Sequence, residues 1–407
     1  MSIDFKSDET EASSGDSSLP LETQKDVGNY SSSGSWEIQE IEPWTEPVDG
    51  NVLLNELKEV IQRYVVLPKW GAETVALWVV HTHAFQLRDV STYLGIESPE
   101  KRCGKTTLLS VLSELSNRAV ALANISSPAV FRAIEEKQPT LLIDEADTFL
   151  QGNDQLRGIL NSGYTRKTAF VVRVAARRRV DGSSLMVDGK VGKESQLARF
   201  SCWCPKVMAA IGHLPETLAD RCIVIRMQRK TRGEECEKLR NLDGSVLRRK
   251  CARFVKDHAR EIACARPALP PDLNDRASDV WEPLLAIAEL AGVEWPEKAR
   301  EAAAGLTYVA QASSPIGALL CDISECFEAS EMDRLFSRTL VEWLRECKNR
   351  PWIEMGHGKL ISELWLSHQL RPYGIRPKTM WIGEQAAKGY LLEDFGEPFS
   401  RYLPRSG

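Results

Sequence analysis

Short, continuous runs of apolar residues alternate along this chain with longer segments in which apolar residues recur every three or four positions. The runs have the length of strands that are buried on both faces, whereas the longer spacing is typical of helices. Because strands separated by helices pair in parallel, the pattern predicts an α/β fold. The predicted strands are residues 90–96, 119–126, 140–143, 206–212 and 222–227, and the predicted helices in this region include 52–65, 72–85, 106–115, 128–136, 154–162 and 214–220.

A different pattern interrupts this region between residues 169 and 204. Residues 169–177 and 198–204 read as strands on either side of a polar, glycine-rich stretch at 181–194. Two such runs around a glycine-rich connection predict a long β-hairpin inserted into the fold. Cys202 and Cys204 share one face of its second strand, and two alternate cysteines cannot make a zinc site unaided, so we expect buried thiols.

The C-terminal half is predicted to be mostly helical. Helical patterns cover residues 234–265, 274–291 and 296–305, which have the length of a lid packed after the α/β core. Three further helices at 315–327, 337–347 and 359–370 precede two strand-like runs at 379–382 and 389–392, the order of elements in a winged helix. The predicted domains are an acidic tail at 1–41, a core at 42–230 with the hairpin at 169–204, a helical lid at 231–310 and a winged-helix domain at 311–407.

Charge changes this picture only at the N-terminus. Residues 1–50 carry 12 acidic and 2 basic side chains, so the net charge of −5 leaves the remainder mildly basic. The tail is rich in Ser, Glu, Asp and Gly, which predicts disorder. No run of about 18 apolar residues is present, and the ten cysteines lack the spacing of a disulfide framework. We expect a cytoplasmic protein with no membrane partner.

The most informative motif lies between the first predicted strand and the next helix. It consists of Ser98, Pro99, Glu100, Lys101, Arg102, Cys103, Gly104, Lys105, Thr106 and Thr107. A strand, a tight loop, Gly-Lys-Thr and a helix can hold the phosphates of ATP through backbone N–H groups and the lysine ammonium, while the threonine hydroxyl binds Mg²⁺. Pro99 stands where a P-loop has its first glycine, and the alternative is an ordinary turn into a helix.

A second motif supports the first. Asp144 and Glu145 follow the buried strand at 140–143, at the carboxyl end where parallel sheets bind ligands. Asp144 would hold Mg²⁺ through water, beside the Thr106 ligand, and Glu145 would orient or deprotonate the water that attacks the γ-phosphate. An acidic cap on the next helix is the alternative for this segment alone. Because both motifs occur about forty residues apart with a strand-helix unit between them, the sequence predicts a P-loop ATPase that uses ATP and Mg²⁺.

Several segments together resemble a known family. They are SPEKRCGKTTLL, PTLLIDEADTF, ILNSGY, IGHLPETLADRCIVI, LNDRASDVWEPLLAIAELAG and the terminal KGYLLEDF with RYLP. These are similar to a bacterial family of uncharacterised ATPases found in phages, plasmids and other mobile elements, often beside or fused to primase modules. That family is similar to AAA+ helicases of superfamily 3 and the poxvirus D5 type. The resemblance spans residues 42–405 and implies an AAA+ core with a lid.

The resemblance also implies roles for single residues. Arg221 matches the place of an arginine finger that reaches the nucleotide of a neighbouring subunit, and Arg276 matches a second sensor of the γ-phosphate. The alternatives are an ordinary helix-end arginine and a surface arginine. The first sensor is normally Asn or Thr, whereas Gly212 and His213 stand there. The hairpin would line the pore of a ring and bind the nucleic-acid backbone; a solvated hairpin without a ligand is the other interpretation.

Basic residues are the expected nucleic-acid contacts. They are Arg173, Arg177, Arg178 and Arg179 on the hairpin stem, Lys190 and Lys193 at its tip, and Arg376 and Lys378 in the winged helix. The leading hypothesis is an ATP-dependent DNA translocase or helicase that forms a homo-oligomeric ring and serves replication of a mobile element, with a primase as a possible partner. The alternative is an ATP-gated switch or loader that recruits a primase, polymerase or defence effector without processive unwinding. A small-molecule kinase fits poorly.

Overall fold

The computed structural model describes residues 40–122, 127–176, 186–187, 190–191, 195–240, 242–312, 315–347, 350, 352 and 360–403. The described residues from 40 onward belong to one unit. The predicted disordered tail at 1–41 lies outside the described residues except for its last two positions.

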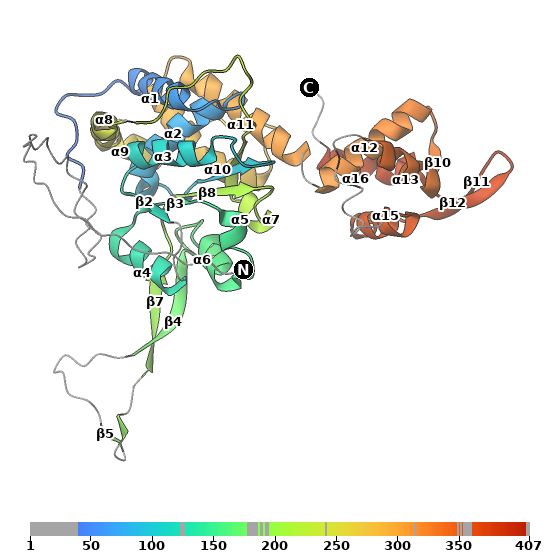
Figure 1. The fold of residues 1–407 in the computed structure, drawn as a ribbon, viewed down its shortest axis with the longest axis horizontal. Coiled ribbons are helices and arrows are strands. Elements are labelled where there is room, and N and C mark those ends of the chain that lie inside the picture. Colours follow the sequence, from blue (N-terminus) through green and yellow to red (C-terminus); the bar gives the residue numbers. More distant parts are fainter. Residues whose placement is uncertain are drawn as a thin grey trace, which may run out of the picture. The chain divides into compact units, whose positions relative to one another are not determined.

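The centre of the fold is a five-stranded sheet in the order β2-β3-β8-β1-β9 (Figure 1). Its strands are β1 (Tyr93–Ser98), β2 (Ala119–Leu122), β3 (Thr140–Ile143), β8 (Lys206–Ile211) and β9 (Cys222–Arg226). All four neighbouring pairs are parallel. The predicted α/β fold with a parallel sheet is confirmed. Because β8 lies between β1 and β3, the loops that follow these three strands meet at one edge of the sheet.

Helices connect the strands and enclose the sheet. They are α1 (Gly50–Tyr64), α2 (Gly71–Ala84), η1 (Phe85–Leu87), α3 (Lys105–Leu115), α4 (Ser127–Lys137), α5 (Ala146–Phe149), α6 (Asp154–Ser162) and α7 (Glu216–Ala219). After β9 follow α8 (Ser245–Asp257), α9 (Ala259–Cys264), α10 (Asp275–Ala291) and α11 (Trp295–Ala312). The sequence placed most of these elements within two or three residues of their observed ends.

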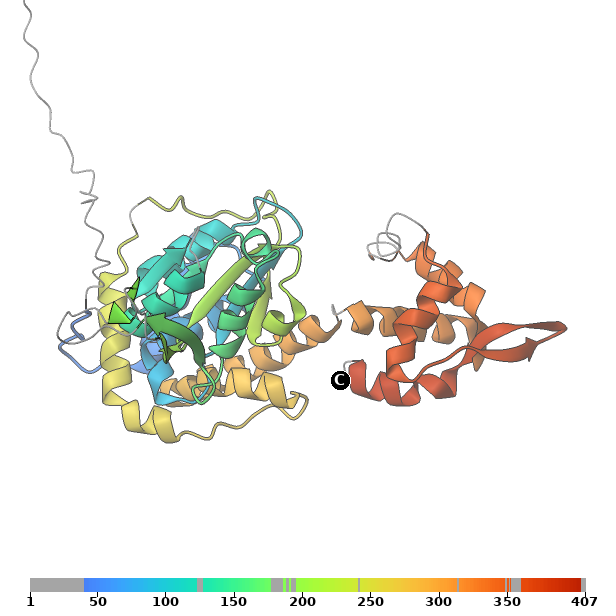
Figure 2. The same ribbon diagram turned by 90° about the horizontal axis from the view of Figure 1, so that it is seen from below.

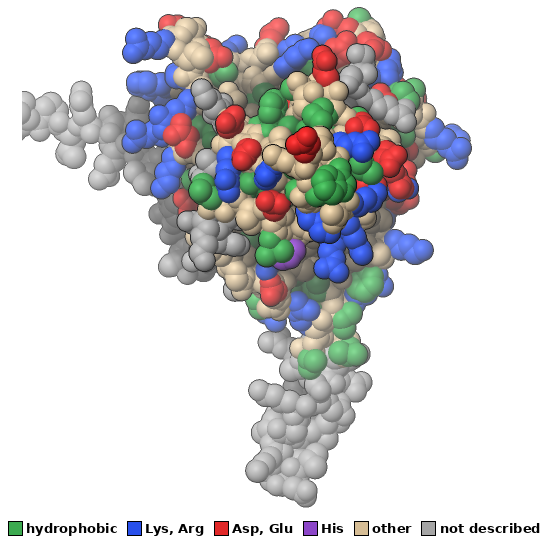
Figure 3. Space-filling model, turned by 90° about the vertical axis from the view of Figure 1, so that its right-hand side faces the viewer, with side chains coloured by type: hydrophobic (Ala, Val, Ile, Leu, Met, Phe, Trp, Pro, Cys, Tyr) green, Lys and Arg blue, Asp and Glu red, His purple; other side chains and the backbone are tan. Residues whose placement is uncertain are grey.

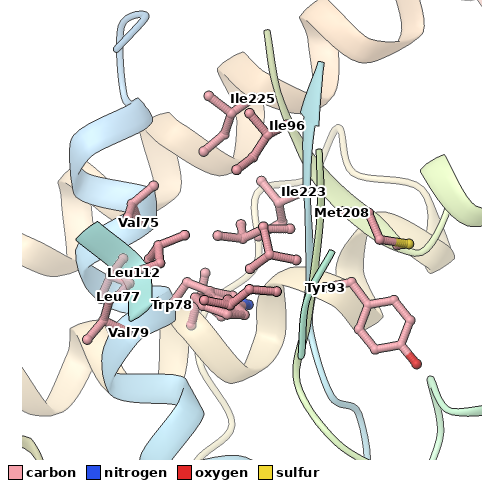
Figure 4. Close-up of a cluster of buried hydrophobic side chains, with 14 of the residues drawn as sticks. Val75, Leu77, Trp78, Val79, Tyr93, Ile96, Leu112, Met208, Ile223 and Ile225 are labelled. Atoms are coloured by element: carbon pink, nitrogen blue, oxygen red, sulfur yellow. The ribbon is translucent and has the colours of Figure 1, made fainter. Parts of the chain in front are cut away.

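Helix α2 is buried around most of its circumference, because it packs against α1, α10 and α11. Figure 4 shows Val75 and Trp78 of α2 facing Ile96, Ile223 and Ile225, while Tyr93 and Met208 lie on the other face of the sheet. The indole N–H of Trp78 donates to the carbonyl oxygen of Thr92 at 2.8 Å, so the polar atom of this buried ring is satisfied.

A β-hairpin projects from the core between α6 and β8 (Figure 1). Its stem consists of β4 (Phe170–Ala176) and β7 (Ser195–Ser201), which pair antiparallel from Phe170 opposite Ser201 to Ala176 opposite Ser195. Two short strands, β5 (Met186–Val187) and β6 (Lys190–Val191), pair farther out. The stem strands lie one to three residues from the predicted bounds at 169–177 and 198–204.

One predicted helix is partly wrong. Residues 234–240 and 242–244 have no helical structure, and the first helix of the predicted lid begins only at Ser245. The charged composition suits a helix, but tertiary contacts hold this segment extended: the N–H of Glu237 donates to the carbonyl oxygen of Arg63 at 2.9 Å. A Cβ at Gly244 would lie 2.0 Å from the carbonyl oxygen of Glu114, so only glycine allows this approach.

The C-terminal segment has a second hydrophobic core of its own. It contains α12 (Pro315–Ser330), β10 (Arg334–Phe336), α13 (Ser337–Glu346), α15 (Glu363–Leu370), η2 (Arg371–Tyr373), β11 (Lys378–Ile382), β12 (Gln385–Leu391), η3 (Leu392–Phe395) and α16 (Gly396–Tyr402). The strand pair β11–β12 extends away from the helices (Figure 2), and the sequence missed β10, which makes a third strand in the order β10-β12-β11. Its assignment as a winged helix stays a prediction.

Within the described part of the chain, no helix combines the length and the apolar character that crossing a membrane requires.

The buried imidazole of His81 makes the stability of this core depend on pH. Its Nε2 accepts the backbone N–H of Thr92 at 3.1 Å, which requires a neutral ring. Burial, aided by Arg88, lowers the pKa of His81 to about 3. Between the usual pKa of 6.5 and about 3 the unfolded chain binds a proton that the folded chain does not, so stability falls as the pH falls through this window.

We expect His81 to contribute a loss of about 1.4 kcal/mol in the free energy of unfolding for each pH unit between 6.5 and about 3. Urea unfolding at several pH values would measure it, with His81→Gln as the comparison because the glutamine oxygen can also accept the Thr92 N–H. Equal pH dependence in the two proteins would contradict the assignment.

Candidate functional site

The predicted phosphate-binding loop connects β1 to α3 at the carboxyl edge of the sheet. β1 ends at Ser98 and α3 begins at Lys105, which leaves a loop of six residues. Arg102 and Gly104 have φ angles of 68° and 88°, so the chain turns through two left-handed conformations before it enters the helix. Glycine adopts this conformation at no steric cost, which explains Gly104 directly before the lysine. The N–H groups of the first turn of α3 are left without helical partners at this point.

Three contacts hold the loop in place. The Nζ atom of Lys105 donates to the Oγ atom of Ser98 at 2.5 Å, and the lysine is only 9% exposed. The Ser98 hydroxyl in turn donates to the carbonyl oxygen of Glu100 at 2.7 Å. At the rim, Glu100 pairs with Arg229, which follows β9, at 2.5 Å. The lysine ammonium therefore folds back into the loop, as a phosphate-binding ammonium would.

The carboxylates of the second motif lie beside the same loop. The Oγ1 atom of Thr106 donates to the Oδ2 atom of Asp144 at 3.0 Å, although 38 residues separate them in the chain. The other carboxylate oxygen of Asp144 accepts the backbone N–H of Glu145 at 2.9 Å. Glu145 itself is exposed and has a φ of 51°, a left-handed conformation rare for a glutamate. A hydroxyl and a carboxylate at this separation are the hard oxygen ligands that Mg²⁺ prefers.

A cavity of about 590 Å³ opens next to this loop. It is lined by Gly104, Thr106 and Thr107, by residues 64–66 at the end of α1, and by residues 236–239 of the extended segment after β9. The volume is in the range of small-molecule sites. The sequence did not point to residues 64–66 or 236–239, and the second segment is the one it expected to be helical.

Glu97 is a site residue that sequence reasoning missed. Glu97 is the penultimate residue of β1, and only 3% of it is exposed. Its Oε1 accepts the backbone N–H of Leu214 at 2.9 Å. Its Oε2 lies 3.0 Å from Nδ1 of His213 and 3.2 Å from Nε of Arg226. The carboxylate therefore joins the ends of β1, β8 and β9. A carboxylate inside an otherwise buried strand was the available signal.

Arg221 and Arg276 share one aromatic partner. Their guanidinium carbons lie 5.9 Å and 5.0 Å from the centre of the Tyr164 ring. Arg221 also donates to the carbonyl oxygen of Thr217, and Arg276 pairs with Asp220 at 3.3 Å. The structure thus brings the two predicted arginines together, in contact with Tyr164 of the ILNSGY segment. The role of each stays a prediction.

The predicted nucleic-acid contacts are only partly described. Arg177, Arg178, Arg179 and Lys193 lie outside the described residues, and of Lys190 only its backbone position in β6 is described. Arg173 lies on the stem with its guanidinium 5.5 Å from the ring of Phe131 on α4. In the C-terminal segment Arg376 is exposed, whereas Lys378 pairs with Asp394 at 2.7 Å.

A fully buried lysine fixes the base of the hairpin. The Nζ atom of Lys206, the first residue of β8, donates to the carbonyl oxygens of Cys202 and Cys204 at 2.9 and 3.0 Å and to the hydroxyl of Tyr93 at 2.9 Å. Cys202 and Cys204 are buried thiols, as predicted, and burial raises the pKa of both. No local pattern around Lys206 indicated that its side chain would be enclosed.

Comparison with known proteins identifies a relative from Saccharopolyspora erythraea named "Uncharacterized 28.9 kDa protein in xis 5'region". The two are 30% identical over 187 residues, which make up 44% of this chain and 69% of the relative. The chain belongs to the family of this protein. A family model described as "Protein of unknown function (DUF3631)" matches residues 226–402, which cover the extended segment, the helices after it and the C-terminal segment.

Two solved structures have a distant likeness to this family member. The A-form apo structure of the C-terminal region of NrS-1 has a TM-score of 0.38 and 11% identity, over 86% of this chain and 77% of that one. A full-length MCM homologue from Methanopyrus kandleri has a TM-score of 0.34 and 13% identity, over 66% of this chain and 62% of that one. Neither likeness is close enough to carry an argument about fold or activity.

We expect Lys206→Met to lower the free energy of unfolding by about 2–4 kcal/mol, because it leaves a buried hydroxyl and two buried carbonyls without their charged donor. Lys298→Met is the matched control, since Lys298 pairs with Glu294 and lies over the ring of Trp295, and surface contacts of this kind contribute about 1 kcal/mol or less. Urea unfolding of both variants measures the difference. Similar losses would mean that the buried ammonium does not stabilise the base of the hairpin.

Proposed function

We propose that this protein is an ATP-dependent DNA translocase or helicase that serves replication of a phage, plasmid or other mobile element. The observation that carries the proposal is the pair of contacts at the carboxyl edge of the sheet, Lys105 with Ser98 and Thr106 with Asp144. They bring an ammonium, a hydroxyl and a carboxylate from both sequence motifs to one loop beside a cavity of about 590 Å³.

These residues fit ATP and Mg²⁺ by their chemistry. The free N–H groups at the start of α3 and the Lys105 ammonium would bind the β- and γ-phosphates. Thr106 and Asp144 would hold the cation, which when bound neutralises charge on the phosphates. Glu145, exposed beside Asp144, would orient or deprotonate the attacking water. Residues 64–66 and 236–239 would enclose the nucleoside.

A ring of identical subunits would complete each ATP site. Arg221 is placed by its contact with Tyr164, and as an arginine finger it would stabilise charge on the phosphoryl group held by a neighbour. Arg276 lies on the same tyrosine ring, so we assign it to the same surface as Arg221. The hairpin would contact the DNA backbone inside the ring, and the C-terminal segment, as a winged helix, would bind duplex DNA or a primase.

A second candidate is an ATP-gated switch or loader that recruits a primase, polymerase or defence effector. Two of the predicted DNA contacts are engaged within the chain, Lys378 with Asp394 and Arg173 with the ring of Phe131. A protein that recruits partners needs the nucleotide site and the ring surface, but it does not need a row of free basic side chains for DNA. The engaged state of these two residues therefore favours the switch or loader.

The two candidates differ in their response to single-stranded DNA. A translocase should hydrolyse ATP faster with single-stranded DNA, and charge reversal by Lys190→Glu with Lys193→Glu should abolish that stimulation. A switch should retain its ATP-dependent assembly in the same variant. Hydrolysis that single-stranded DNA does not stimulate, together with no ATP-dependent strand displacement, would exclude the translocase.

We expect Glu145→Gln to retain ATP binding and to reduce hydrolysis about a hundredfold or more, because a group that positions or deprotonates water is removed. Lys105→Ala is the comparison: it should weaken ATP binding itself, since a charge facing the phosphates is lost. Calorimetric titration with Mg-ATP separates the two effects from phosphate release. If the Glu145→Gln variant hydrolyses ATP at the original rate, a residue other than Glu145 positions or deprotonates the attacking water.

We expect Arg221→Ala to spare ATP binding and to slow hydrolysis on the order of a thousandfold if the finger acts in trans. Mixing it with Lys105→Ala tests this arrangement, because a mixed ring contains sites with an intact loop on one subunit and an intact arginine on the next. Partial recovery of hydrolysis on mixing supports shared sites. Full activity from a monomer, shown by mass measurement, would contradict them.

A further inference from the structure

We propose that a groove at the base of the hairpin, together with the open face of its stem, binds one unpaired strand of nucleic acid. The groove has a volume of about 550 Å³ and lies next to the residues that precede β8, at the end of that strand away from the nucleotide loop. The inference rests on the proposed function and names a contact surface for it. The groove is lined by Gln86, Glu135, Gln138, Arg166, Arg199 and Trp203, with Ala169, Phe170 and Ser201 at the root of the stem.

Two arginines of the groove are held by aromatic rings. The guanidinium carbon of Arg199 lies 3.4 Å from the centre of the Phe170 ring, and that of Arg166 lies 5.7 Å from the centre of the Trp203 ring. Arg166 also donates to the carbonyl oxygen of Gln86. An arginine held against an aromatic ring can still donate the N–H groups at the edge of its guanidinium plane to a phosphate oxygen. Both side chains are exposed.

The remaining polar groups do not cancel these charges. Among the described residues that line this groove, Glu135 is the one carboxylate, and it already accepts the backbone N–H of Ser201. Gln86 donates to the side-chain oxygen of Gln138 at 2.6 Å. This lining therefore has two arginine cations and one carboxylate, Glu135, that already accepts a hydrogen bond. The side-chain amides of Gln86 and Gln138 can hydrogen-bond to the edges of bases.

The two faces of the stem differ. Alternate residues share a face, so Val171, Arg173 and Phe200 lie together, and Phe200 packs on Phe131 of α4 with 4.8 Å between ring centres. The other face bears Phe170, Val172, Val174, Leu197 and Arg199. Val172, Val174 and Leu197 are 46%, 71% and 71% exposed, and Figure 3 shows hydrophobic side chains on the described part of the stem.

An unpaired strand matches this surface better than a duplex. Aliphatic and aromatic side chains contact the faces of bases, and these faces are free only where the strand is not paired. The open face supplies such side chains, and Arg199 and Arg166 supply contacts for the phosphates at its root. Duplex DNA would place phosphates over the three aliphatic side chains and leave them without a partner.

The test is binding of a fluorescein-labelled oligothymidylate to the full chain, followed by anisotropy at several salt concentrations. Arg166→Gln with Arg199→Gln should weaken binding at least tenfold and reduce the slope of log K against log salt by about 0.7 for each phosphate that the protein no longer neutralises. Val174→Ser with Leu197→Ser should weaken binding about tenfold without changing that slope, because no charge is removed. Arg260→Gln, an exposed arginine on α9, is the matched control.

Each result has a distinct meaning. If the original protein binds the oligonucleotide and both groove variants bind it like Arg260→Gln, the groove assignment is wrong and the proposed translocase stands. If the original protein binds no oligonucleotide, both the groove assignment and the proposed translocase are wrong. If the groove variants lose binding only because mass measurement shows that the assembly has dissociated, the open face is a contact between copies, and the assignment to nucleic acid is overturned.

Discussion

The hydrogen bond between Thr106 and Asp144 depends on the parallel order of the sheet. β1 and β3 are not neighbours, because β8 lies between them, yet the loops after both strands meet at one edge. In a parallel sheet all strands end at the same side, so groups that are distant in sequence converge there without any long connection. An antiparallel β3 would carry Asp144 and Glu145 to the opposite edge. The candidate nucleotide site thus exists because the strand order and direction place the two motifs side by side.

Strand β8 has polar anchors at both of its ends. At its start the ammonium of Lys206 holds the chain of the hairpin base through two carbonyl oxygens. At its end the N–H of Gly212 donates to the carbonyl oxygen of Ser98 at 2.8 Å, directly at the loop. The hairpin and the loop are therefore connected through a single strand of six residues. Any rearrangement of the loop that shifts Ser98 acts on the same strand that anchors the hairpin.

Much of this arrangement could be predicted from the sequence. Runs of apolar residues located all five strands of the sheet, and the spacing of the two motifs anticipated the contact between Thr106 and Asp144. Such signals are local, since each depends on residues adjacent in the chain. Glu97 and Lys206 were missed because their environments are made by distant segments: Leu214 and Arg226 surround the carboxylate, and Tyr93 receives the ammonium. The extended segment at 234–244 was missed for the same reason, because its partner Arg63 lies far back in the chain.

In the proposed ring, the contact of two arginines with Tyr164 would limit where an ATP phosphate could reach them. Arg276 is bound to Asp220 and to the tyrosine ring, and Arg221 reaches the same ring from the turn after α7. If Arg276 served the nucleotide of its own loop and Arg221 that of a neighbour, the tyrosine would have to release one of them in each cycle. If both arginines face the neighbouring subunit, the rigid aromatic ring of Tyr164 orients both guanidinium groups at once, and no contact has to be broken. The second arrangement needs the smaller movement, and in the proposed ring Tyr164 would then set the geometry of the contact between subunits.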